Sequence, residues 1–568
     1  MNRRRFLQSA LIFGGAAAMH RLSGCTPALK RNRGTVKTGR CERRADLVIA
    51  GAGLGGCAAA LAALRNGLTV ILTEPTDWIG GQLTSQGVPP DEHRWIETHG
   101  ATALYRQLRR KIRDTYRADY PLTDDARARE HLNPGDGAVS RLCAEPPVAL
   151  AVLQRMMAPW ISSGRLAILT EHVVTAADVT GARVRALKAT DIRTGGQIVL
   201  TAPWFADATE LGDLLPLTGT EYVTGAESQR DTGELHAHPE GDPDNQQAFT
   251  VCFAMDYVPG TDNRIPKPAE YDFWRSYVPD LAPPWPGRLL DLTYTHPPTH
   301  RPRRLGFHPE GIRTGDTLNL WVYRRIINRN NFLPGTYEGD ITIVNWPQND
   351  YMLGNLTDDF GSHFERGKQL SLSLLHWLQT EVPRPDGGYG WPGLRLRRDI
   401  MGTEDGMAKH PYVRESRRIK AEFTVLEEHV GAENRALVTG RPQELAADFY
   451  DSVGIGYYHI DLHPSSGGVN YIDFPSLPFQ IPLGALLPVR MDNLLAANKN
   501  IGTTHITNGC YRLHPVEWNI GESVGMLAAW AEMKKTVPRA VREDRNMLDA
   551  FQAFIRAQGV ETHWPSST

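Results

Sequence analysis

Residues 45–56 read Ala-Asp-Leu-Val-Ile-Ala-Gly-Ala-Gly-Leu-Gly-Gly, and this stretch decides the fold. Its apolar first half predicts a buried strand that leads directly into the pattern Gly51-x-Gly53-x-x-Gly56. Gly51 permits the tight turn after the strand, Gly53 lets the backbone approach a diphosphate, and Gly56 lets the next helix pack closely. Free N–H groups at the start of that helix favour negative charge. We therefore expect a nucleotide diphosphate to bind here.

The following residues complete a βαβ unit. Residues 54–64 are small and rich in alanine, as suits a helix pressed onto a sheet, and Asn66-Gly67 supplies a helix stop. Residues 69–73 predict a second buried strand, which ends at Glu74, about 20 residues beyond the glycines, where an acid binds the adenosine ribose. An ordinary βαβ unit with a chance glycine pattern is the alternative. Strand, helix and acid together favour the nucleotide site.

A second glycine-rich segment separates two cofactor classes. Gly80-Gly81-Gln82 stands where the next element of a simple nicotinamide-dependent dehydrogenase should begin. It resembles the segment that runs along the ribitol and isoalloxazine in flavoproteins of the glutathione-reductase-like class. A purely structural loop is the competing interpretation. The segment favours FAD over NAD.

Charge is distributed unevenly along the 568 residues. The net charge is −2, but the first 44 residues hold eleven Lys and Arg against Glu42 alone, so the rest of the chain is acidic. An acidic body argues against nucleic acid as the main partner, because backbone phosphates require a basic surface. The length suggests two to four domains or a discontinuous pair.

The basic N-terminus resembles an export signal. Residues 3–7 read Arg-Arg-Arg-Phe-Leu and precede an apolar stretch at 10–19, which is too short to span a membrane. This resembles a signal for the twin-arginine export machinery, which carries folded proteins. Residues 22–25 resemble a lipobox ending at Cys25, whereas cleavage near 16–18 and an uncleaved anchor are alternatives. We expect an exported protein, in the periplasm or on the outer face of the cytoplasmic membrane, with a lipid anchor if Cys25 is modified.

The remaining chain predicts an interrupted cofactor domain. Residues 166–174 predict a strand, 182–202 a hairpin, and 204–207 a returning buried strand. Residues 492–497 and 515–533 predict a closing strand and a helix whose N-terminus faces the flavin pyrimidine. Gly521 and Gly525 lie one turn apart on that helix, but we do not expect a membrane-style Gly-x-x-x-Gly contact.

These elements predict an α/β protein. Its Rossmann-like FAD-binding domain has three layers with a β-meander crossover, and an α+β substrate domain is inserted into it. The predicted division is a signal peptide (1–25), a basic tether (26–44), the first part of the FAD domain (45–225, with a helical insertion at 90–145), the substrate or cap domain (226–475), the closing part (476–535) and a helical tail (536–568).

Taken together, the segments resemble a family of FAD-dependent oxidoreductases, some of whose exported relatives carry the label xanthan lyase. Residues 411–419 (Pro-Tyr-Val-Arg-Glu-Ser-Arg-Arg-Ile) and 482–531 also match its pattern, whereas 208–213 read Ala-Thr-Glu-Leu-Gly-Asp in place of Ala-Thr-Gly-Asp-Gly-Asp. Gln82 replaces the histidine that holds flavin covalently in the fumarate-reductase-like branch, so we expect non-covalent FAD. The expected cofactor-binding residues are Gly51, Gly53, Gly56, Glu74, Gly80, Gly81, Gln82, Val173, Asp207, Gly502 and Asn519.

A flavin accepts hydride, so the protein must position the substrate and remove a proton. His505 and His514 are the candidate bases, and Arg417 is the candidate for binding substrate charge. Each histidine has a structural alternative, and the arginines at 414, 417 and 418 suit a salt-bridge node equally. His459, Asp461 and His463 predict one strand face that suits a metal or a sugar pocket. We expect no metal, because no partner cluster is identifiable, and no disulfide framework.

The leading hypothesis is an exported enzyme that transfers hydride from a small polar organic substrate to FAD. A carbohydrate-derived substrate is one candidate, and the electron acceptor is unidentified. Two other classes stay open. One is a flavin-assisted lyase without net redox change. The other is a cell-surface glycan-binding protein with structural FAD, in which the glycan contacts come from Trp274, Trp285, Tyr389 and Trp391.

Overall fold

A five-stranded parallel sheet forms the centre of the cofactor domain in the computed structural model, which describes residues 41–312 and 317–565. The predicted signal peptide and Cys25 lie outside the described residues. The predicted strand before the glycine pattern is the central strand of this sheet. In sheet order the strands are β23 (Leu494–Ala496), β8 (Trp204–Asp207), β2 (Leu47–Ala50), β3 (Val70–Glu74) and β4 (Leu166–Thr170).

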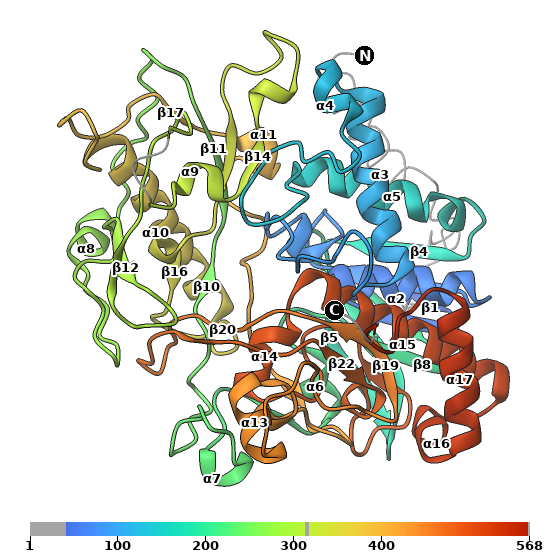
Figure 1. The fold of residues 1–568 in the computed structure, drawn as a ribbon. Coiled ribbons are helices and arrows are strands. Elements are labelled where there is room, and N and C mark those ends of the chain that lie inside the picture. Colours follow the sequence, from blue (N-terminus) through green and yellow to red (C-terminus); the bar gives the residue numbers. More distant parts are fainter. Residues whose placement is uncertain (1–40, 313–316, 566–568) are drawn as a thin grey trace, which may run out of the picture.

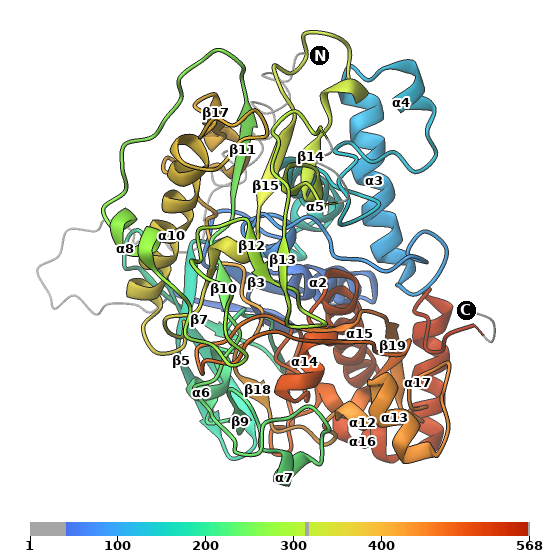
Figure 2. The ribbon, with the colours of Figure 1, turned by 60° about the vertical axis from the view of Figure 1, so that its left-hand side comes forward.

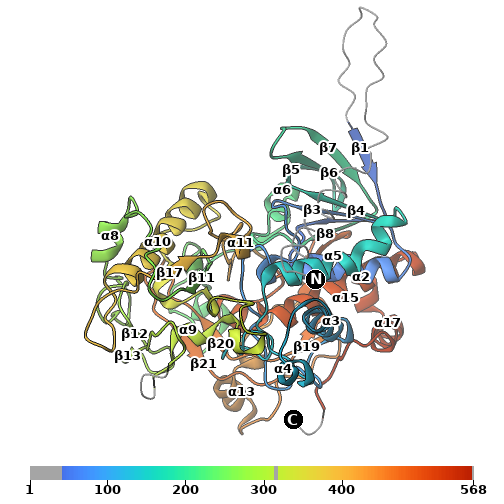
Figure 3. The ribbon, with the colours of Figure 1, turned by 90° about the horizontal axis from the view of Figure 1, so that it is seen from above.

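Different layers cover the two faces of this sheet. Leu47 and Ile49 of β2 pack into one apolar cluster with α2 (Leu54–Arg65) and α15 (His514–Lys534). Val48 and Ala50 point the other way, as alternation along a strand requires, and pack with the β-meander. Figure 3 shows this arrangement, which confirms the predicted three-layer fold. The meander strands are β5 (His172–Thr180), β6 (Arg183–Asp191) and β7 (Gln197–Thr201).

Two boundaries differ from the predictions. Residues 166–174 are not one strand: β4 ends at Thr170 in the parallel sheet, and β5 begins at His172 in the meander. Glu171 separates them in the left-handed region, with φ 58°, which turns the chain from one sheet to the other. Strand β1 (Cys41–Arg44) pairs in parallel with β7, so the last four residues assigned to the tether belong to the meander sheet.

Helices α2 and α15 approach each other through glycines. A Cβ at Gly521 would lie 1.9 Å from the carbonyl oxygen of Gly55, and one at Gly525 would lie 2.2 Å from that of Ala59. Gly521 and Gly525 therefore make a close contact of the Gly-x-x-x-Gly kind inside the cofactor domain, whereas the sequence argued only against a membrane-style contact. Close helix contact needs small residues wherever both backbones are buried, and α15 is buried from His514 through Ala531.

The segment between the two parts of the cofactor domain carries its own antiparallel sheet and apolar cluster. Helix α10 (Phe360–Thr380) lies in this segment (Figures 1 and 2) and contributes to the second cluster. Trp274, Trp285 and Trp391 are core residues there, with at most 6% exposure, which argues against their predicted glycan contacts. In order, the strands are β14 (Arg325–Ile327), β15 (Ile341–Val344), β11 (Phe253–Tyr257) and β17 (Leu394–Leu396).

Among the described residues, no helix is long and apolar enough to cross a membrane. The cysteines at 57, 143, 252 and 510 are buried free thiols.

Helices flank the cofactor domain on its outside. They are α3 (Ala103–Asp119) and α4 (Asp124–Ala128) in the predicted insertion, α5 (Pro146–Ser162) after it, and α16 (Pro538–Glu543) and α17 (Arg545–Ala557) in the tail.

Candidate cofactor and substrate site

The two glycine-rich loops lie against each other. A Cβ at Gly81 would lie 2.7 Å from the Cα of Gly53, and a Cβ at Gly53 would lie 2.9 Å from Glu210 Oε1. Gly51 and Gly80 have φ values of 90° and 108°, which favour glycine. At Gly56, a Cβ would meet the carbonyl oxygen of Gly51 at 2.0 Å, so this glycine permits the tight strand-to-helix packing. Side chains at these positions would fill the cradle.

Carboxylate oxygens already accept backbone N–H groups in this cradle. Glu74 Oε2 accepts from Ala52 N at 3.1 Å, and burial raises the pKa of Glu74 to about 7. Glu517 Oε1 accepts from Gly55 N at 2.9 Å, so a carboxyl oxygen caps the first turn of α2. This is the position that a diphosphate takes at a helix N-terminus. These N–H groups are the donors that a phosphate-bearing cofactor would take in place of the two carboxyl groups.

Polar side chains from the returning strand and the closing loop complete the cradle. Asp207 accepts Thr209 N at 3.0 Å and Leu214 N at 3.1 Å, so its carboxylate holds the turn that places Glu210. Glu210 forms a buried ion pair with Lys499. Asn498 Nδ2 donates to the carbonyl oxygen of Ala208 at 3.0 Å, which ties the closing loop to the same turn.

Unpaired polar atoms gather along this cradle. Among the described residues, Gln82 Oε1, Glu210 Oε1 and both amide atoms of Gln86 are buried without a hydrogen-bond partner. A native interior leaves few such atoms unpaired. A cofactor with hydroxyl and amide groups, such as the ribitol and pyrimidine of FAD, would satisfy them. The residues present therefore fit FAD.

Three predicted cofactor residues lie differently from the rest. Asn519 Nδ2 donates to the carbonyl oxygen of Val453 at 3.2 Å, so it binds β19 (Ser452–Gly456). Gly502 permits close packing, because a Cβ there would lie 2.4 Å from the Cβ of Ala421. Val173 lies in β5, two residues after Glu171, whose N–H donates to the carbonyl oxygen of Thr76 at 3.0 Å.

A buried polar cluster adjoins the Gly80–Gly87 loop. Arg512 Nη1 donates to Tyr412 Oη and Nη2 to the carbonyl oxygen of Asp461, both at 2.8 Å. The carbonyl oxygen of Arg512 accepts from Gln82 Nε2 at 3.3 Å. Arg512 therefore links the cofactor loop to the cap. Its Nε has no partner among the described residues.

His463 connects the same cluster to two carboxylates. Its Nδ1 lies 2.6 Å from Asp350 Oδ2, and its Nε2 lies 3.7 Å from Asp461 Oδ2. Arg414 binds the other oxygen of Asp350 at 3.0 Å, and its guanidinium carbon lies 4.9 Å from the Tyr412 ring centre. We use "polar cluster" for Asp350, Tyr412, Arg414, Asp461, His463 and Arg512.

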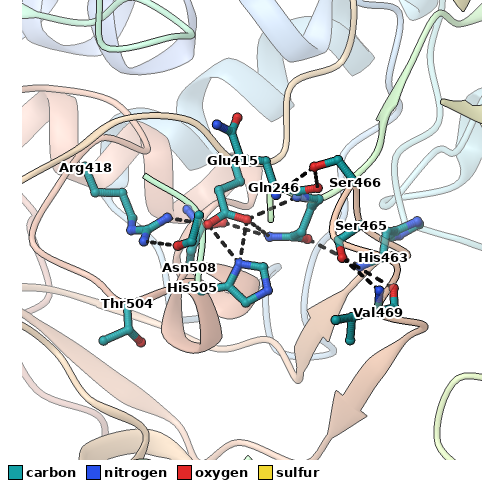
Figure 4. Close-up of polar contacts among 12 residues, drawn as sticks. Gln246, Glu415, Arg418, His463, Ser465, Ser466, Val469, Thr504, His505 and Asn508 are labelled. Atoms are coloured by element: carbon teal, nitrogen blue, oxygen red, sulfur yellow. Dashed lines mark hydrogen bonds and ion pairs between the residues drawn. The ribbon is translucent and has the colours of Figure 1, made fainter. Parts of the chain in front are cut away.

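The predicted catalytic residues do not come together. His514 is buried, with Nδ1 accepting from Asp91 N at 3.2 Å and Nε2 beside the carbonyl oxygen of Val88, and burial lowers its pKa to about 3. These contacts hold a neutral ring in place and leave no nitrogen for a substrate. Arg417 binds the carbonyl oxygen of Leu211 at 2.9 Å, a structural contact. His505 binds Glu415 (Figure 4), outside the polar cluster.

Sequence reasoning named Asp461 and His463 as one strand face but did not connect them to Arg512. The alternation around β20 (Ile460–Leu462) was the available signal. Asp350, Tyr412 and Arg414 come from distant segments, and no local pattern brings them together. Arg324 and Asp91, an ion pair at 3.3 Å, were missed for the same reason.

This fold and cradle define a flavin-binding α/β protein of the Rossmann type. The family model described as FAD dependent oxidoreductase matches residues 46–555, and the chain belongs to that family. Among curated proteins, no significant match is found. The protein is thus an enzyme of the flavin-dependent oxidoreductase class.

Solved structures of flavoenzymes are also similar to the chain, at low identity. OxyS anhydrotetracycline hydroxylase from Streptomyces rimosus has 11% identity and a TM-score of 0.34, over 91% of this chain and 66% of that one. The E. coli quinol fumarate reductase subunit FrdA has 12% identity and a TM-score of 0.31, over 91% and 74%. L-proline dehydrogenase from P. horikoshii has 14% identity and a TM-score of 0.17, over 33% and 24%. The chain spans 24–48% of the first three structures that it matches.

Buried carboxyl groups predict the pH dependence of stability. Burial raises the pKa values of Glu74, Asp207 and Glu522 to about 7, above the value of about 4 of unfolded chains. Between these limits the folded state holds more protons than the unfolded state, so the free energy of unfolding falls as pH rises. We expect FAD-free protein to lose thermal stability between about pH 6.5 and pH 8. Below this interval the lowered pKa values of the buried His93 and His514 act in the opposite direction.

The matched variant is Glu522→Gln, which keeps an acceptor for Trp518 Nε1, now 3.0 Å from Glu522 Oε2. This variant should lose less stability over the same interval. Thermal denaturation at a series of pH values measures both proteins. A wild-type stability that rises with pH across the interval would contradict the prediction.

Proposed function

We propose that the protein oxidises a small polar organic substrate by hydride removal beside the polar cluster. The observation that carries this proposal is the position of Arg512. Its carbonyl oxygen accepts from Gln82, and its guanidinium group binds Tyr412 and Asp461. One residue therefore connects the loop that suits the flavin with polar groups that suit a hydroxyl-bearing substrate.

FAD supplies hydride acceptance when it is bound. The chain must then orient the substrate and take its hydroxyl proton. His463 is the proton acceptor in this proposal, because Asp350 binds its Nδ1 at 2.6 Å and orients the ring. Its Nε2 lies 3.7 Å from Asp461 Oδ2, beyond hydrogen-bond distance, so this nitrogen is left to take the proton. Arg512 and Tyr412 orient the substrate by hydrogen bonds. Asp350, Tyr412, Arg414 and Arg512 are buried, which strengthens those contacts, whereas the side chain of His463 is 20% exposed.

We further propose that FAD is held non-covalently. Gln82 carries an amide, which is no nucleophile toward flavin, and its Nε2 donates to Glu517 and to the carbonyl oxygen of Arg512. Acid precipitation would release the flavin into the supernatant if the proposal holds. Flavin that stays with the precipitated protein would contradict it.

Anaerobic reduction tests the oxidoreductase proposal. Purified protein should lose its visible flavin absorbance with at least one member of a panel of sugars, hydroxy acids and amines. His463→Gln should slow this bleaching by about 100-fold, because a general base contributes 10²–10⁴-fold. FAD content should stay at the wild-type level. Arg441→Gln, at an exposed position, is the control and should bleach at the wild-type rate.

Other outcomes favour the alternative functions. Product formation without bleaching and without an electron acceptor would favour the lyase. Bleaching that His463→Gln leaves unchanged would reject His463 as the proton acceptor. Glycan binding without any bleaching would favour the binding protein, although three of its four proposed aromatic contacts are buried in the cap core.

Export is a separate proposal. It rests on the Arg-Arg-Arg-Phe-Leu sequence at 3–7 and the apolar stretch at 10–19. The lipobox-like residues 22–25 support a lipid anchor on the outer face of the cytoplasmic membrane. Cell fractionation with and without Cys25→Ser would distinguish an anchored protein from a periplasmic one. Retention of the intact chain in the cytoplasm would contradict export.

A further inference from the structure

A cavity of about 190 Å³ lies beside the N-terminus of helix α14 (His505–Tyr511). None of the glycine-rich loop residues and none of the polar cluster lines it. Its walls combine polar and apolar groups. The lining includes Glu227, Glu234, His236, Asn245 and His505 together with Ala237, Val469, Ile472 and Ile506.

Glu234 is the unusual residue of this cavity, because one of its buried carboxyl oxygens has no hydrogen-bond partner among the described residues. The residue is 1% exposed, and its Oε1 accepts from Thr504 Oγ1 at 2.6 Å and from Glu427 N at 2.9 Å. Its Oε2 has no partner among the described residues, and neither has Oδ1 of Asn245, which is 4% exposed. Two unpaired buried acceptors in the lining of one cavity cost free energy unless a donor reaches them.

Among these neighbouring carboxylates, Glu234 is the one without a cationic partner in the described part of the chain. Arg418 binds both Glu227, at 2.8 Å, and Glu415. His505 Nδ1 lies 2.8 Å from Glu415 (Figure 4). Glu427 has His236 Nδ1 at 2.8 Å.

Protonation of Glu234 removes the negative charge that lacks a cationic partner. Burial, with the nearby charges of Glu227 and Glu427, raises the pKa of Glu234 to about 7. Above that pH the cavity holds a buried carboxylate whose second oxygen lacks a donor. A ligand that brings both a positive charge and N–H donors would satisfy this oxygen.

We propose that this cavity binds a small organic ammonium compound. The ammonium group offers three donors and no acceptor, which matches the unpaired oxygens of Glu234 and Asn245. The apolar part of the ligand packs on Val469, Ile472 and Ile506. A cavity of 190 Å³ is small, so it suits a short aliphatic amine. A metal ion is less suitable, because no group of three or more potential ligands occurs among the described residues.

Calorimetric titration of the FAD-loaded full chain tests this proposal at about pH 8, where Glu234 is charged. The probes are butylamine hydrochloride and butan-1-ol, which share the apolar chain and differ in charge. We expect butylammonium to bind and butanol to bind at least about tenfold more weakly, the effect of about 1.4 kcal/mol. Equal binding of both probes, or no binding of butylammonium, would overturn the proposal.

Three variants locate the site. Glu234→Gln removes the charge and should weaken butylammonium at least about tenfold. Ala237→Leu fills the cavity without changing charge and should weaken it similarly, which keeps the test valid if the first variant folds poorly. Glu444→Gln, an exposed position, should bind as the wild type does. Wild-type affinity in both cavity variants would reject the site, whatever the result of flavin bleaching.

Discussion

Gly53→Ala should abolish most FAD binding while leaving the fold intact. Gly53 has φ −60° and ψ −173°, a conformation that alanine adopts without strain, so the backbone should not change. The added methyl group would lie 2.9 Å from Glu210 Oε1 and 3.2 Å from Glu517 Oε1, in the space between the two glycine-rich loops. We expect FAD affinity to fall by about 100-fold, equivalent to about 2.7 kcal/mol.

The measurement is the ratio of flavin to protein after gel filtration, followed by titration of the FAD-free protein with FAD. Gly196→Ala is the matched control, because Gly196 is an exposed loop residue whose Cβ would meet only Thr194 Oγ1. It should bind FAD as the wild type does. The thermal stability of FAD-free Gly53→Ala should match that of wild-type FAD-free protein. An unchanged FAD affinity would show that the diphosphate does not approach this residue.

The cofactor domain was predictable because its signals are local. Strand β2, the glycines and helix α2 lie within about 20 consecutive residues, and each step has a sequence signature. Helix α15 begins at His514, one residue before the predicted Pro515. Glu171 shows the limit of such signals, because nothing in its residue type indicates a left-handed backbone that divides one predicted strand into two.

The substrate side was less predictable, because its contacts join distant segments. Tyr412 and Arg512 form one hydrogen bond across 100 residues of sequence, and Asp350 and His463 are 113 residues apart. Hydrophobic periodicity carries no information about such pairs. For His514 the residue type suggested a base, but the backbone groups of Val88 and Asp91 occupy both ring nitrogens. Geometry therefore changes the candidate base from His514 to His463.

Gly521→Ala should destabilise the cofactor domain more than any other substitution considered. The added Cβ would lie 1.9 Å from the carbonyl oxygen of Gly55 and 2.6 Å from its Cα, and both are backbone atoms that cannot rotate away. Removing this clash requires α15 to move away from α2, and that movement would open a gap along a buried interface. Overpacking usually costs 1–3 kcal/mol, and a clash with backbone places this variant at or above about 4 kcal/mol.

Chemical denaturation of the FAD-free proteins measures this loss as a lower free energy of unfolding. Gly361→Ala in α10 is the control, since its Cβ would make an ordinary contact of 3.8 Å with Asp359 Oδ1 and alanine is the better helix former. It should be as stable as the wild type or slightly more stable. If Gly521→Ala matched this control, the two helices could separate without cost. The glycines would then not determine how the closing helix, which carries Glu517, is held against the nucleotide-binding turn.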